Sequence, residues 1–149
     1  MKEITYQPIG LIHSDIKSFD NAPIQAVYSP NRKGWIELYS AYKEGLMDIE
    51  GFSHIILIYH FHLCRGVALK YKPFLDDTPH GVFAIRSPLR PNPIGLSVVK
   101  LDSVVDSILH ISGVDMLDGT PLLDIKPFIP QFDNRDGVKI GWLKDKNIK

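Results

Sequence analysis

The sequence predicts an all-β protein: a single-domain antiparallel β-barrel with a few short helical turns. Short runs rich in β-branched residues dominate the chain, and its 11 prolines and 11 glycines lie mostly between these runs. Helix signals are scarce. A sheet of this size has edges, which closing into a barrel or dimerising would remove. A length of 149 residues suits one domain, spanning residues 1–149.

The expected strands follow in chain order. Residues 4–13 mix polar and apolar side chains, and residues 34–39 (GWIELY) alternate as a strand does. Residues 53–63 are nearly all apolar or histidine, as expected of a strand with both faces covered. Further strands are expected at residues 82–85, 94–105 and 108–114, with Asp106-Ser107 as a two-residue turn between the last two. Short helical turns are expected at residues 42–47 and 67–71.

Charge and composition restrict the possible functions. Seventeen basic and seventeen acidic residues balance, so a nucleic-acid surface would have to be a local patch. Basic residues gather between positions 65 and 90, although a solvated loop of mixed charge explains them as well. The first residues form no apolar leader, and the longest apolar run, residues 55–63, is too short to cross a bilayer. We therefore expect a cytoplasmic protein that does not enter the membrane. The single cysteine, Cys64, cannot form an internal disulfide.

The first segment with chemical potential is RSPLRPNPIG, residues 86–95. Its three prolines fix φ and restrict the residues before them, so the loop should be stiff. A stiff loop that carries Arg86 and Arg90 suits a carboxylate or a phosphate, which a guanidinium grips with two hydrogen bonds. Gly95 lets the chain re-enter a strand or lets a ligand approach the backbone. The alternative is a rigid connector with solvated arginines.

The second segment is VDMLDGTP, residues 114–121, which continues to Pro127. Asp118-Gly119 is a strong turn signal because glycine readily adopts positive φ. Backbone N–H groups, the Asp118 carboxylate and the Thr120 hydroxyl would lie together at its mouth and could hold the adenine or ribose of a cofactor. The alternative is a plain hairpin turn.

The third segment contains three histidines. On a strand, His54, His60 and His62 would share one face with two isoleucines. Structural histidines that donate to carbonyls are the alternative. The sequence contains neither the glycine-rich dinucleotide fingerprint nor a phosphate-binding P-loop. A nucleotide-like cofactor would therefore not bind at the helix terminus of a Rossmann fold.

Several strings together resemble the motifs of the TrmO (TsaA-like) family: PIG at 8–10, FSH at 52–54, GVFAIRSPLRPNPIGLS at 81–97 and VDMLDGTPLLDIKPF at 114–128. In order and spacing the resemblance covers residues 8 to about 133. One early loop departs from the family pattern P-R-Q-P, because Ile24 stands where the arginine is common. The chain also ends soon after Trp142, without the C-terminal extension that bacterial members often carry.

The resemblance implies a homodimeric β-barrel enzyme that binds S-adenosylmethionine near the subunit boundary. Its expected reaction is methylation of the substituted exocyclic nitrogen of threonylcarbamoyladenosine, beside the anticodon of a tRNA. The implied cofactor-binding residues are Pro23, Ile24, Gln25, His62, Leu63, Arg86, Leu96, Leu117, Asp118, Gly119 and Thr120. Arg86 is assigned to the methionine carboxylate, and Arg90 and Asn92 to the RNA substrate.

The accepting nitrogen is a weak nucleophile, because its lone pair is delocalised into the purine and the carbamoyl group. Either a base removes its proton or hydrogen bonds favour the reactive tautomer. His62 and Asp118 are the polar candidates for this catalytic role.

Two other classes of function stay open. A cupin-type metal enzyme is indicated by His60-x-His62, a spacing that suits a first-row metal on one strand face. Cupins follow this pair with a glutamate, and residues 63–68 supply none, so no metal is expected. The other class is a non-catalytic regulator that binds S-adenosylmethionine and signals through a dimer.

Overall fold

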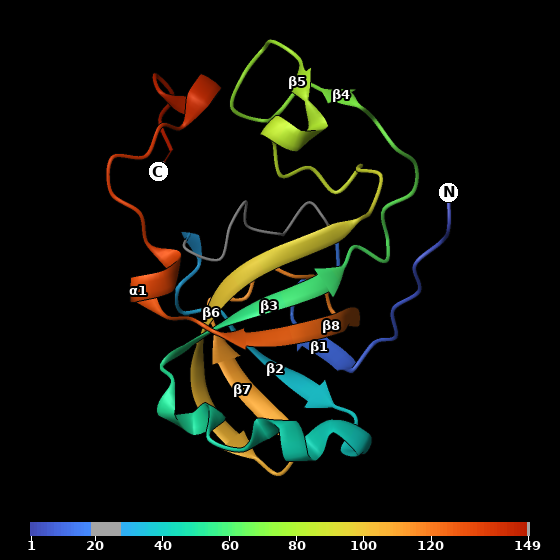
Figure 1. Cartoon of the computed structure of the whole chain (residues 1–149), viewed down its shortest axis with the longest axis vertical. Helices are drawn as coiled ribbons and strands as arrows, with labels where there is room; N and C mark the ends of the chain where they lie inside the picture. Colours follow the sequence, from blue (N-terminus) through green and yellow to red (C-terminus); the bar gives the residue numbers. More distant parts are fainter. Residues whose placement is uncertain (19–27, 149) are drawn as a thin grey trace.

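A computed structural model gives the fold of residues 1–18 and 28–148. Six antiparallel strands close into a barrel in the order β1-β2-β7-β6-β3-β8 (Figure 1). The strands are β1 (Gly10–Ser14), β2 (Lys33–Leu38), β3 (His54–His60), β6 (Ile94–Val105), β7 (Ile108–Ser112) and β8 (Thr120–Pro127). The predicted all-β barrel is confirmed.

The long strand β6 connects two halves of the barrel. Its first half, up to Lys100, pairs with β3, and its second half pairs with β7. The pairing with β7 shifts register between Leu101 and Ser103, where the strand changes partner. Asp106, at φ 55°, and Ser107 then form the predicted turn into β7. Since β6 turns around the barrel, its beginning lies at one end and its β7 hairpin at the other (Figure 1).

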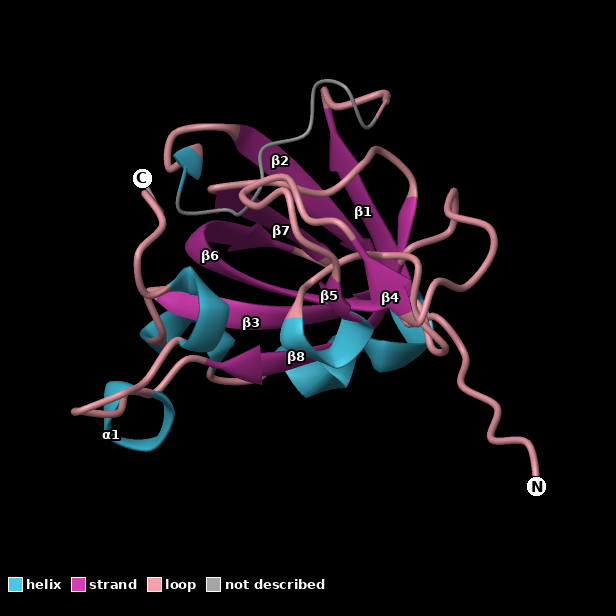
Figure 2. Cartoon of the chain, turned by 90° about the horizontal axis from the view of Figure 1, so that it is seen from above, coloured by secondary structure: helices cyan, strands magenta, loops and turns pink. Residues whose placement is uncertain are grey.

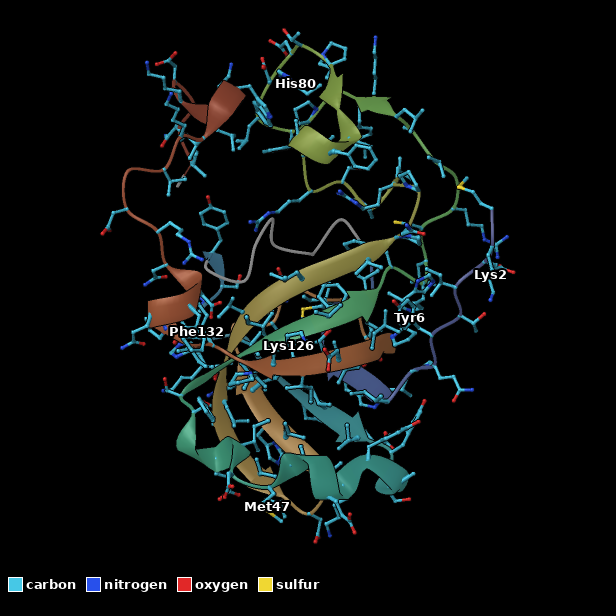
Figure 3. The ribbon with its side chains drawn as sticks, in the orientation of Figure 1. Lys2, Tyr6, Met47, His80, Lys126 and Phe132 are labelled. Atoms are coloured by element: carbon cyan, nitrogen blue, oxygen red, sulfur yellow. The ribbon has the colours of Figure 1, made fainter. Side chains whose placement is uncertain are left out.

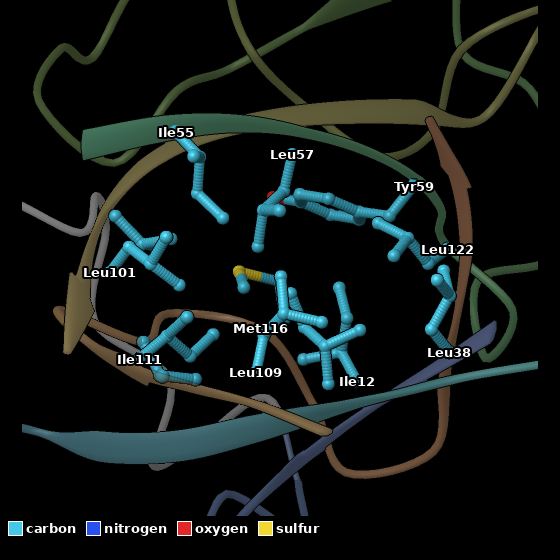
Figure 4. Close-up of a cluster of buried hydrophobic side chains, with 13 residues drawn as sticks. Ile12, Leu38, Ile55, Leu57, Tyr59, Leu101, Leu109, Ile111, Met116 and Leu122 are labelled. Atoms are coloured by element: carbon cyan, nitrogen blue, oxygen red, sulfur yellow. The ribbon is translucent and has the colours of Figure 1, made fainter. Parts of the chain in front are cut away.

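The core fills the barrel interior with side chains from alternating positions (Figure 4). In β3, Ile55, Leu57 and Tyr59 point inward while the residues between them are more exposed. Each fully buried aliphatic side chain contributes about 1.5–3 kcal/mol relative to an exposed one. The cluster comprises Ile12, Ile36, Leu38, Ile55, Leu57, Tyr59, Val99, Leu101, Leu109, Ile111, Val114, Met116 and Leu122.

Several segments of the described chain lie outside the barrel wall (Figures 1 and 2). The helical turns η3 (Ser40–Leu46) and η4 (Ile49–Gly51) pack Leu46 and Ile49 against the core at one end. At the other end lies the excursion, defined as residues 61–93, with β4 (Lys70–Tyr71), β5 (His80–Gly81) and η5 (Val82–Ala84). The C-terminal segment, residues 138–148 with η6 (Gly141–Leu143), lies beside the excursion. The short helix α1 (Pro130–Asp133) leads to it from β8.

Several sequence predictions were wrong in detail. Residues 4–9 lie outside any strand, since Ile4 and Tyr6 are exposed and β1 begins only at Gly10. Residues 82–84 form a helical turn instead of the strand predicted at 82–85. This segment makes no ladder pairing, and its one backbone bond to a neighbouring segment in the described chain runs from Val82 N to Leu69 O at 2.9 Å. Residues 67–71 contain β4 instead of a helical turn. The strand β8 was not predicted as such, because prolines at two of its positions obscure the pattern.

A pocket between the barrel and the excursion

A pocket of about 590 Å³ opens where the barrel meets the excursion. The end of β3, the beginning of β6, the proline-rich loop and the turn before β8 each supply part of its wall. The lining residues are Tyr59, Phe61, His62, Leu63, Phe83, Ile85, Arg86, Pro88, Arg90, Asn92, Ile94, Gly95, Leu96, Asp115, Leu117 and Thr120. Its volume lies within the range of small-molecule sites.

The fold brings most of the predicted site residues to this one pocket. Those in its wall are His62, Leu63, Arg86, Arg90, Asn92, Leu96, Leu117 and Thr120. Asp118 and Gly119 belong to the same turn but are not part of the lining. Pro23, Ile24 and Gln25 lie outside the described residues.

The proline-rich loop is held by one of its own arginines. Arg90 Nη1 donates to the backbone oxygens of Ile85 at 3.0 Å and Ser87 at 3.2 Å, on either side of Arg86. A further bond runs from Leu89 N to Ser87 Oγ at 3.2 Å. The two arginines of the loop therefore differ, because Arg90 fixes the backbone that carries Arg86.

The turn at Asp118-Gly119 forms as predicted, with Gly119 at φ 79°. Its polar groups, however, bind the protein itself. The backbone N–H groups of Asp118 and Gly119 donate to oxygens of Ile16 and Ile12, each at 2.8 Å. The Thr120 hydroxyl donates to Leu117 O at 2.6 Å. The backbone groups expected to hold a ligand thus anchor the turn to β1 and to the segment that follows it.

The two candidate bases lie in different surroundings. Burial, followed by the nearby charge of His60, lowers the pKa of His62, so its imidazole is neutral and keeps a lone pair at neutral pH. Asp118 accepts from Lys17 Nζ at 2.7 Å and from Ser14 N at 3.1 Å. These hydrogen bonds, that of Lys17 foremost, lower the pKa of Asp118 and make it a weak base. Of the two, only His62 lines the pocket as a neutral base.

Glycine is required at position 95 because two aromatic rings cover it. Tyr59 stands directly opposite Gly95 in the ladder, and a Cβ at position 95 would collide with the Tyr59 ring and lie 2.8 Å from Phe61 Cζ. The rings of Tyr59 and Phe61 meet edge to face at a centroid distance of 5.5 Å. The glycine of the PNPIG motif therefore permits an aromatic floor in the pocket.

A polar chain on the pocket floor was missed by the sequence analysis. Ser97 Oγ donates to Asp115 Oδ1 at 2.7 Å, and Tyr59 Oη lies 2.9 Å from Ser97 Oγ. Burial, followed by the charge of Asp115, raises the pKa of the Tyr59 phenol above its usual value. One signal could have found Asp115: it is a charged residue between the buried apolar residues Val114 and Met116.

The histidines do not form the arrangement expected for a metal enzyme. His54 and His60 lie on the outer face of β3 with Ile56 and Ile58, as predicted, but the strand ends at His60. His62 follows in a turn and so does not share that strand face. In residues 1–18 and 28–148, no three His, Cys, Asp or Glu side chains are grouped so that they could hold a metal ion.

Comparison with known proteins identifies the family of the chain. The profile of the tRNA-methyltransferase O N-terminal domain matches residues 11–134, which include every lining residue of the pocket. The chain belongs to the TrmO N-terminal domain family. No helix of the described chain is long and apolar enough to cross a membrane.

Relatives of this TrmO-family chain differ in length. A probable S-adenosyl-L-methionine-binding protein of Pyrococcus abyssi is 54% identical over 145 residues, which are 97% of this chain and 78% of that protein. A tRNA (adenine(37)-N6)-methyltransferase of Homo sapiens is 34% identical over 150 residues, 96% of this chain but only 34% of the human protein. A crystal structure of TrmO superposes with a TM-score of 0.81 at 37% identity, covering 94% of this chain and 64% of that one.

Proposed function

We propose that this chain is an S-adenosylmethionine-dependent methyltransferase that acts on the substituted exocyclic nitrogen of threonylcarbamoyladenosine, beside the anticodon of a tRNA. Residues 1–149 would form its TrmO-type barrel domain. The observation that carries the proposal is the convergence of Arg86, His62 and Leu96 with the turn before β8 on one pocket, although they are distant in sequence. Relatives named as S-adenosyl-L-methionine-binding proteins and as tRNA methyltransferases support it.

The residues of the pocket fit the cofactor. S-adenosylmethionine, when bound, supplies a methyl group on a sulfonium centre. Arg86 offers a guanidinium to the methionine carboxylate. Tyr59, Phe61 and Leu96 provide an apolar and aromatic surface of the kind that nucleoside ligands occupy. The predicted contacts from Pro23, Ile24 and Gln25 would come from outside the described part of the chain.

The pocket also suggests how the acceptor is prepared. His62 is the better candidate base, because its imidazole is neutral and lines the pocket. Asp118 is instead proposed as a positioning residue. It accepts hydrogen bonds from Ser14 N and Lys17 Nζ and so holds Leu117 and Thr120 in the pocket wall. Arg90 and Asn92 lie at the same wall and are proposed to contact the RNA.

We further propose that the protein is a cytoplasmic homodimer. The excursion exposes several large apolar side chains that a second copy of the chain would cover. These are Val67, Leu69, Phe74 and Phe83, each at least 60% exposed. A second copy that packs here would reach the pocket through Phe83, which also lines it.

Titration calorimetry with S-adenosylmethionine tests the cofactor assignment. Arg86→Ala is expected to weaken binding by about 10- to 100-fold, because a charge-assisted hydrogen bond contributes about 1.5–3 kcal/mol. Arg135→Ala is the matched control, since Arg135 is exposed and bonds only to nearby backbone oxygens among the contacts described. Equal affinity of Arg86→Ala and wild type would contradict the role of Arg86.

A second function, that of a non-catalytic S-adenosylmethionine-binding regulator, is favoured by the names of the archaeal relatives, which mention binding alone. Methyl transfer to tRNA carrying threonylcarbamoyladenosine separates the two. Transfer by wild type, reduced in His62→Ala, supports the enzyme. Tight binding without transfer to any tRNA fraction supports the regulator.

A further inference from the structure

Asp115 is the carboxylate that the fold places in the pocket wall. Among the described residues it is the only acidic side chain that lines the pocket. It lies between Val114 and Met116, two buried core residues, so the barrel interior fixes its backbone. A carboxylate in so apolar a setting is costly to charge unless donors or cations compensate it.

The hydrogen bonds at Asp115 have a defined direction. The Ser97 hydroxyl has one hydrogen, which it donates to Asp115 Oδ1 at 2.7 Å. The Tyr59 hydroxyl must then be the donor to Ser97 Oγ, at 2.9 Å. Ser97 and Tyr59 are both buried, at 3% and 5% exposure, so water does not compete for these bonds. The two aligned hydroxyls therefore form a chain of hydrogen bonds that ends at the Asp115 carboxylate and holds its orientation.

Asp115 and Arg86 bring opposite charges to the wall of the same pocket. Both charges act on the same Tyr59 phenol, Asp115 raising its pKa and Arg86 lowering it. Both side chains also line the pocket. A ligand that carries a carboxylate and an ammonium group on one carbon atom would match this pair of charges.

Resting on the proposed function, we infer that Asp115 binds the α-ammonium group of the methionine part of S-adenosylmethionine, with Arg86 at its carboxylate. Asp115 would thus be a specificity-determining residue that recognises the amino-acid part of the cofactor. The ammonium is a better partner than the sulfonium, because it offers three N–H donors to the carboxylate and the sulfonium offers none.

The test is titration calorimetry of the full chain with S-adenosylhomocysteine and with its deamino analogue, S-adenosyl-4-thiobutyrate. S-adenosylhomocysteine keeps the ammonium but lacks the sulfonium charge. Wild type is expected to prefer it to the deamino analogue by about 10- to 100-fold, the range for a charge-assisted hydrogen bond. Asp115→Asn is expected to lose most of this preference, through weaker binding of S-adenosylhomocysteine alone.

Three results would overturn the inference. The first is an equal loss of affinity for both ligands in Asp115→Asn. The second is a loss for S-adenosylmethionine but not S-adenosylhomocysteine, which would assign Asp115 to the sulfonium. The third is unchanged binding with a shifted pH profile of methyl transfer, which would make Asp115 a base.

A second variant keeps the test valid if Asp115→Asn fails to fold. Ser97→Ala removes the donor and keeps the charge, so the preference for the ammonium ligand should fall only in part. An unchanged preference in Ser97→Ala would contradict the role of the hydroxyl chain. Wild type that binds none of these adenosyl ligands would refute the proposed function itself, whereas binding without an ammonium preference would refute only the role of Asp115.

Discussion

The barrel and the excursion, which together form the pocket, are stabilised in different ways. The barrel has six strands in a closed ladder around a buried apolar core. The excursion has only two short paired strands, and the C-terminal segment holds it through side chains. His80, labelled in Figure 3, stacks on Trp142 at 4.4 Å, and Trp142 Nε1 donates to Ala84 O at 2.8 Å. One wall of the pocket is therefore set by backbone pairing and the other by a few side-chain contacts.

Asp76 joins the excursion to the C-terminal segment. It lies 2.8 Å from His80 Nε2 and accepts from Lys146 Nζ at 3.2 Å. Ala84, which accepts from Trp142, directly precedes Ile85 and Arg86 of the pocket wall. Trp142 and Lys146 therefore lie beyond the matched family profile, which ends at 134, yet they hold the segment that leads into the pocket wall.

The largest expected effect belongs to the barrel. Leu57→Ala removes a side chain that is fully buried in the core. It is expected to lower the free energy of unfolding by about 2–5 kcal/mol, through lost burial and the cavity left behind. The free energy of unfolding is measured by urea denaturation, with far-ultraviolet circular dichroism as the signal. Met47→Ala, at a site that is 79% exposed, is the control and should change it by less than about 0.5 kcal/mol.

A smaller, local effect is expected in the excursion. Trp142→Phe keeps an aromatic ring against His80 but removes the donor to Ala84 O. The local stability of the excursion should fall by about 1 kcal/mol, the net contribution of one hydrogen bond. Amide hydrogen exchange should become faster at Val82, which bonds Leu69 O, and stay unchanged in β3 and β6. Trp35→Phe, at the stack of Trp35 on His13 in the barrel, is the control. Equal acceleration in both regions would show that the two are not independent.

The smallest expected effect depends on pH. The hydrogen bond from His80, followed by that from Lys146, lowers the pKa of Asp76 in the folded chain. This stabilisation is complete above the unfolded pKa, about 3.9, and is lost as the pH falls through the lower folded pKa. Trp142 fluorescence is measured during urea titrations at pH 5 and pH 3, in a Trp35→Phe background. The C-terminal segment should detach at a lower urea concentration at pH 3 than at pH 5. With Asp76→Asn, the difference between the two pH values should shrink; an undiminished difference would assign it to other carboxylates.

Local chemistry made much of the fold predictable from the sequence. The strand at residues 94–105 and the turn at Asp106-Ser107 appear as predicted, because side-chain alternation and turn propensity act between near neighbours. The same holds for the glycine turn at 118–119. The motif residues Arg86, Leu96 and Thr120 were selected from sequence strings, and the closed barrel then brings them to one pocket.

Long-range contacts decided the rest. Only the folded chain shows that residues 82–85 lack a ladder partner and that β8, despite its prolines, pairs with β1 and β3. In one short motif, Asp118 binds Ser14 and Lys17 while Asp115 lines the pocket. The sequence alone therefore determined the family and the barrel, and it identified motif residues that line the pocket. The tertiary structure decided which polar groups reach the pocket, because burial and pairing depend on residues up to about a hundred positions away.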